Sequence, residues 1–96
     1  MYKKSFLLRS FGVFYEDLQQ LNKAQEMYKE AIQLLEENNL SQTYDYGFTL
    51  YCSGRVDCDK YHLSESIPKL QASIILLHKY YQYMHGEVKE VQDLLE

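Results

Sequence analysis

The sequence predicts an all-helical fold, and three observations support that prediction. One proline and four glycines in 96 residues supply few of the residues that punctuate strands and turns. Strong helix formers such as Leu, Glu, Gln and Lys dominate most windows of the chain. Apolar residues recur at spacings of three and four, the period of a helix with one buried face. We therefore expect antiparallel helical hairpins, with four helices and a short C-terminal helix.

The first two helices are expected over residues 4–18 and 22–37, joined by a link so short that they must be antiparallel neighbours. Asn22 is a plausible N-cap of the second helix, and Asn38 and Asn39 are a suitable stop. The first helix carries an apolar stripe of Phe6, Leu7, Phe11, Phe14, Tyr15 and Leu18. The second is expected to bury Ala24, Met27, Tyr28, Ala31, Leu34 and Leu35.

The third helix is expected from near Ser41, a plausible N-cap, to Gly54, although its aromatic interior also has the β propensity of a strand. A polar loop should follow over residues 54–63, and then a fourth helix over residues 65–84 with Pro68 in its first turn. Its apolar stripe consists of Ile67, Leu70, Ile74 and Leu77, widened by Ile75 and Leu76. Residues 87–96 repeat the helical spacing with Val88, Val91 and Leu95.

Composition excludes several classes of function. The length of 96 residues indicates one domain, spanning residues 1–96. The net charge of −4 argues against a nucleic-acid partner, since phosphate binding needs a basic face. No apolar run is long enough to span a bilayer, so we expect no membrane partner. Two cysteines without an export signal predict a cytoplasmic protein with reduced thiols.

Small, bulky and aromatic residues alternate in one register along the first hairpin, where small residues let helices approach and aromatic rings fill the space between them. The positions are Leu8, Gly12, Tyr15, Ala24, Tyr28 and Ala31. This pattern resembles the tetratricopeptide repeat, a helical hairpin of about 34 residues. The second hairpin matches less fully. Gly47, at the place of Gly12, and Leu50 are the small and bulky residues of its first helix, and its second helix repeats a small, bulky, small pattern with Ser66, Leu70 and Ser73.

The resemblance implies a short solenoid. Repeat one would cover about residues 5–38, and repeat two about residues 40–82, with its extra length in an enlarged loop over residues 54–63. Residues 87–96 would be the capping segment that such arrays need.

In this family the first helix of each repeat lines a groove that holds a peptide or a helix of a partner protein. Carried over to this chain, the expected partner-binding residues are Phe6, Arg9, Val13, Glu16, Tyr44, Phe48 and Tyr51, beside Ser41. The family's clamp for a peptide carboxylate needs lysine and asparagine where Arg9 and Val13 stand, so we expect no clamp. Ten tyrosines exceed what a core of this size needs, which favours an interaction surface. The alternative is that these aromatic residues are core, or are covered by the C-terminal segment.

The predicted function is therefore an adaptor or scaffold module for protein–protein interaction, without enzymatic activity or a cofactor. The alternatives are a homo-oligomeric structural module, such as a homodimer, and the sensor domain of a regulatory protein. The sequence has no glycine-rich phosphate loop and no specified nucleophile and base. Cys52, Cys58 and His62 could converge on zinc, but spacings of six and four are not a standard ligand pattern.

Overall fold

The computed structural model describes residues 3–84, and this part of the chain is built from helices. They are α1 (Lys3–Asp17), α2 (Leu21–Glu37), α3 (Tyr44–Asp59) and α4 (Leu63–Met84). No strand occurs between residues 3 and 84, which confirms the all-helical prediction and settles the third segment as helix. The capping segment expected over residues 87–96 lies outside the described residues.

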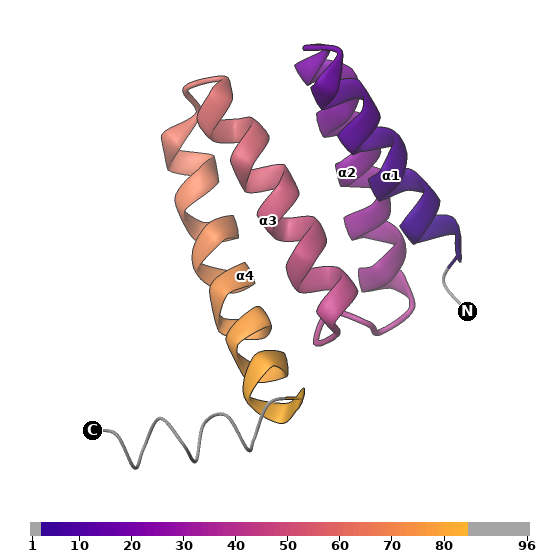
Figure 1. The fold of residues 1–96 in the computed structure, drawn as a ribbon, viewed down its shortest axis with the longest axis vertical. Helices are drawn as coiled ribbons and strands as arrows, with labels where there is room; N and C mark the ends of the chain where they lie inside the picture. Colours follow the sequence, from indigo (N-terminus) through magenta and orange to yellow (C-terminus); the bar gives the residue numbers. More distant parts are fainter. Residues whose placement is uncertain (1–2, 85–96) are drawn as a thin grey trace.

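The helices form two hairpins that lie side by side (Figure 1). Helix α1 packs against α2, and α3 packs against α4. The hairpins meet mainly where α2 packs against α3, with a smaller contact between α1 and α3. Helix α3 is therefore the central element, with the first hairpin on one side and α4 on the other.

The two hairpins turn in the same way. At the end of α1, Gln19 adopts a left-handed φ of 62°, and at the end of α3 Tyr61 adopts the same φ. The backbone N–H of Gln20 donates to the carbonyl of Tyr15 at 2.8 Å, and that of His62 donates to the carbonyl of Asp57 at 2.7 Å. Both turns are Schellman motifs. The two hairpin turns lie 42 residues apart, and so do Gly12 and Gly54, which both sit where two helices approach closely, so we pair the positions of the two hairpins at this spacing.

The enlarged loop predicted over residues 54–63 is wrong, because α3 continues to Asp59 and only positions 60–62 link it to α4. Gly54 does not end the helix. A Cβ there would lie 2.8 Å from Leu70 Cδ2, so the missing side chain serves close approach of α4. Gly12 has the same relation to the ring of Tyr28. Gly54 is therefore the equivalent of Gly12, and the predicted match of Gly47 to Gly12 is also wrong.

The helix caps differ from the predicted ones as well. Helix α3 is capped by Thr43 and not by Ser41, since the Thr43 hydroxyl accepts a hydrogen bond from the Tyr46 N–H at 3.2 Å. Helix α2 begins at Leu21, which places Asn22 inside its first turn. The predicted stop of α2 is confirmed, because Asn39 takes a left-handed φ of 59°.

The hydrophobic core lies at the joint between the hairpins. Ala24 and Tyr28 of α2 meet Cys52 and Val56 of α3, and all four side chains are buried. Most of the apolar stripes predicted on α1 and α4 remain outside this core. The exposed members are Phe6, Leu7, Phe11 and Phe14 on α1, Leu18 directly after it, and Ile67, Ile74 and Ile75 on α4. Periodicity located the helices correctly but did not show which stripes are covered.

Candidate functional site

A row of aromatic rings runs along α3 on the side that faces α1. Tyr44, Phe48 and Tyr51 are four and three residues apart, so they share one face of the helix. The ring centroids lie 6.0 Å apart for Tyr44 and Phe48, and 6.4 Å apart for Phe48 and Tyr51. Tyr80 of α4 extends the row, because its ring lies edge-on to Tyr44 at 6.2 Å.

Arg9 connects α1 to this row. Its guanidinium carbon lies 4.7 Å from the ring centroid of Phe48 and 5.5 Å from that of Phe6. These are cation–π distances. Arg9 Nη1 also lies 3.4 Å from Asp45 Oδ1, and the arginine side chain is largely buried. Arg9 therefore holds an aromatic residue of α1 and one of α3 in the same surface.

Glu16 makes the second connection between α1 and α3. Its carboxylate accepts hydrogen bonds from Nε and Nη2 of Arg55 at 3.0 and 2.7 Å, and another from the Tyr28 hydroxyl. The guanidinium of Arg55 also lies 5.4 Å from the ring of Tyr51. The hydrogen bond with Glu16 raises the pKa of Arg55, and burial together with the same carboxylate raises that of Tyr28. Glu16 is thus a satisfied structural carboxylate.

The structure brings the predicted site residues onto two neighbouring helices, α1 and α3. Those that remain open to solvent are Phe6, Val13, Tyr44 and Tyr51. Phe48 is partly buried against the core, and Arg9 and Glu16 are already paired within the protein. We name the surface formed by Phe6, Arg9, Val13, Tyr44, Phe48 and Tyr51 the aromatic face.

Two residues of this region were not among the predicted site residues. They are Asp45 and Arg55, which pair with Arg9 and Glu16. Arg55 follows Tyr51 by four residues, a spacing that places both side chains on the same face of a helix and could have indicated Arg55. It was missed because position 55 was predicted to lie in a loop.

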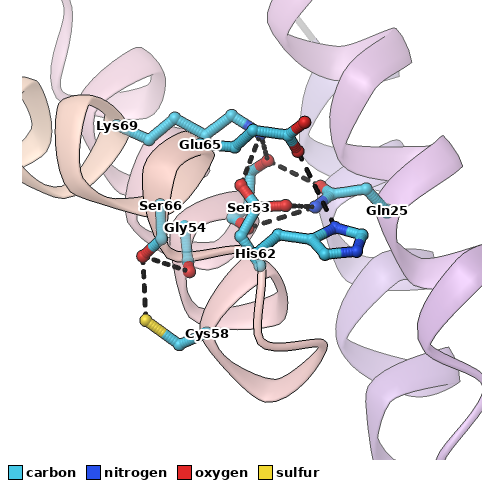
Figure 2. A network of polar contacts seen from close by, with 9 residues as sticks. Gln25, Ser53, Gly54, Cys58, His62, Glu65, Ser66 and Lys69 are labelled. Carbon is cyan, nitrogen blue, oxygen red and sulfur yellow. Dashed lines mark hydrogen bonds and ion pairs between the residues drawn. The ribbon is translucent and has the colours of Figure 1, made fainter.

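A buried polar network lies at the joint between the hairpins (Figure 2). The Gln25 side chain donates to Asp57 Oδ1 at 2.6 Å and accepts from the Ser53 hydroxyl at 2.6 Å. Lys69 Nζ donates to Asp57 Oδ2 at 2.8 Å and to the Ser53 hydroxyl at 3.0 Å. Asp57, Ser53 and Gln25 are buried. The network therefore ties α2, α3 and α4 together with every buried group satisfied.

A cluster of potential metal ligands borders this network. The donor atoms of Asp57, His62 and Glu65 lie within 4.8 Å of one another. However, both Asp57 oxygens already accept hydrogen bonds, one of them from the ammonium of Lys69. A neighbouring cation opposes binding of a metal ion, so a structural network explains the cluster better.

Among residues 3–84, Cys52, Cys58 and His62 do not form a group of potential metal ligands. Cys52 is part of the hydrophobic core, where burial raises the pKa of its thiol. The Cys58 sulfur lies 2.8 Å from the Ser66 hydroxyl. The two thiols therefore have separate structural surroundings.

Comparison of the chain with protein-family models, with curated proteins and with solved structures finds no match. The resemblance to the tetratricopeptide repeat therefore stays a prediction, and the observed spacing of 42 residues exceeds that family's unit of about 34. Between residues 3 and 84, no helix combines the length and the apolar character needed to cross a membrane.

Proposed function

We propose that this chain is an interaction module that holds a peptide or a helix of a partner protein against the aromatic face. The observation that carries this proposal is the exposure of large apolar side chains on one surface. Phe6 is 55%, Tyr44 45% and Tyr51 39% exposed. Aromatic residues are enriched at protein interfaces, where they contribute much of the binding energy.

The charges of the aromatic face define its preferred ligand. Arg9 is engaged by Asp45 and by two rings, and Glu16 is engaged by Arg55. A ligand therefore has no unpaired charge to neutralise at these positions. The suitable partner is an extended peptide or an amphipathic helix with bulky apolar side chains. Arg9 and Glu16 hold the two helices in place before binding, which lowers the cost of ordering the site.

The tetratricopeptide resemblance, the adaptor or scaffold role and a cytoplasmic location belong to the same proposal. The exposed aromatic residues on α1 and α3 agree with the groove that the resemblance implies. Cys52 and Cys58 are free thiols, as expected of a protein in a reducing compartment. We assign no catalytic role to the carboxylates of Glu16 and Asp57, because each is fully engaged in structural pairs.

A peptide library selected for binding to the wild-type chain tests this proposal. We expect the selected peptides to be rich in bulky apolar residues. The double variant Tyr44→Ala, Phe48→Ala should weaken their binding at least tenfold, because it removes two adjoining rings from the face. Tyr61→Ala is the matched control, since Tyr61 is 88% exposed and lies in the turn between α3 and α4.

Circular dichroism of both variants shows whether the helices are retained. If the double variant keeps its helicity and binds the selected peptides as tightly as the wild type, the aromatic face is not the binding site. Loss of binding in the Tyr61→Ala control would also count against the assignment.

A further inference from the structure

The two outer helices expose apolar stripes that the aromatic face does not use. On α1 the stripe runs along Leu7, Phe11 and Phe14, and we name it the leading face. On α4 it runs along Leu63, Ile67 and Ile74, and we name it the trailing face. All six side chains are exposed, with Phe11 at 53% and Ile67 at 54%.

The 42-residue spacing shows what these positions do elsewhere in the same molecule. Phe11 and Phe14 of the leading face correspond to Ser53 and Val56 of α3, which are buried against α2. The leading face therefore repeats, on α1, the surface that α3 presents to the preceding hairpin.

The trailing face on α4 corresponds in the same way to the surface of α2. Leu63, Ile67 and Ile74 correspond to Leu21, Gln25 and Ile32 of α2. Leu21 packs against the core cluster, Gln25 bonds to α3, and Ile32 shares a hollow with Tyr46 and Leu50 of α3. The trailing face therefore repeats, on α4, the surface that α2 presents to the following hairpin.

We propose that copies of this chain associate head to tail, with the leading face of one copy packed on the trailing face of the next. The contact would reproduce between two molecules the α2–α3 joint that each molecule contains. Each copy carries both halves of that joint, which is the reason to name a second copy as the partner. The inference does not depend on the proposed peptide binding.

The chemistry of the two faces agrees with this arrangement. Within one molecule, the joint pairs two polar residues, Gln25 and Ser53, in direct hydrogen bonds. At the equivalent positions of the outer faces stand Ile67 and Phe11, which are both apolar. If only one of these two positions were apolar, the contact would bury a polar group without a partner, at a cost of about 1–3 kcal/mol in general. Because both positions are apolar, the two outer faces match each other.

Such an interface joins two different surfaces, so it propagates from copy to copy and need not close as a dimer. Light scattering on a sizing column should show the wild-type mass rising above the 11.5 kDa of one chain as the concentration increases. Phe11→Asp damages the leading face and Ile67→Asp damages the trailing face. Each variant alone should stay at the mass of one chain.

An equal mixture of the two variants distinguishes this arrangement from others. Phe11→Asp still offers an intact trailing face, and Ile67→Asp still offers an intact leading face, so the mixture should form a dimer of twice the single-chain mass. Circular dichroism confirms that each variant is folded. Tyr61→Asp, a substitution in the turn after α3, is the control and should associate like the wild type.

Three outcomes would overturn the proposal. The first is a wild-type chain that keeps the mass of one chain at every concentration, as expected if another segment covers α4. The second is a single variant that still forms a dimer, which indicates a symmetric contact through the other face. The third is two folded, monomeric variants whose mixture gives no heavier species.

Discussion

Tyr28 in the first hairpin and Leu70 in the second occupy equivalent positions, but they connect to different surroundings. The tyrosine ring is fully buried and covers Gly12, whereas the leucine is partly buried and covers Gly54. The Tyr28 hydroxyl also reaches Glu16, which bonds to Arg55 in the next hairpin. The equivalent of Glu16 is Cys58, whose partner Ser66 lies within its own hairpin.

The two hairpins share a backbone arrangement but differ in the side chains packed within it. Both hairpins use the same turn and a glycine at the helix crossing, although few residues are identical between them. At these equivalent positions, the partly buried Glu16 bonds outward to Arg55 of α3, whereas Cys58 contacts Ser66 within its own hairpin. We therefore expect substitutions in the centre of the first hairpin to affect the joint as well.

The largest expected effect is that of Tyr28→Ala. It removes a fully buried ring and one hydrogen bond of Glu16, so the free energy of unfolding should fall by about 3–5 kcal/mol. Leu70→Ala, at the equivalent position, should cost about 2 kcal/mol because its side chain is only partly buried. Urea titrations followed by circular dichroism measure both values. Equal losses of unfolding free energy would contradict this order.

Alanine substitutions at the two crossing glycines, Gly12 and Gly54, should differ in their effect on stability by a smaller amount. At Gly12 an added methyl group would overlap the rigid ring of Tyr28, and overpacking of this kind costs about 1–3 kcal/mol. At Gly54 the methyl group would meet Leu70, a side chain that can change rotamer. Alanine also favours a helix over glycine by about 1 kcal/mol. Gly12→Ala should therefore lower the urea midpoint more than Gly54→Ala does. The reverse order would contradict this account of the crossings.

The smallest expected effect is a pH dependence from Tyr46, whose equivalent in the first hairpin is Lys4. Burial, and then the hydrogen bond to Glu36, raise the pKa of Tyr46 from 10.0 to about 12. The folded state holds this proton more tightly than the unfolded chain. The resulting stability is complete below pH 10 and is lost as the pH rises from 10 to 12.

The variant Tyr46→Phe isolates this contribution from that of the other tyrosines. The difference in unfolding free energy between wild type and variant should shrink as the pH rises through that range. A difference that stays constant would mean that Tyr46 does not titrate in this way.

Much of the fold could be predicted from the sequence, because helical periodicity and the lack of turn residues are local properties. Helices α1 and α2 begin and end within one residue of the predicted bounds. The end of α3 was not predictable, since Gly54 resembles a terminator and its role depends on Leu70, 16 positions later. The ion pairs of Arg9 with Asp45 and of Glu16 with Arg55 were likewise missed, because the partners lie far apart in the sequence and meet only in the folded chain. The exposure of the outer stripes depends on what covers them, which periodicity does not report.

The most direct test of the central claim is an NMR titration of the isotope-labelled chain with a peptide selected for binding. The account predicts that the resonances that shift most belong to the aromatic face, especially Phe6, Val13, Tyr44 and Tyr51. Changes confined to the outer stripes, at Phe11 and Phe14 of α1 or at Ile67 and Ile74 of α4, would contradict it. In that case the aromatic face is structural, and the binding surface of the molecule lies on its outer helices.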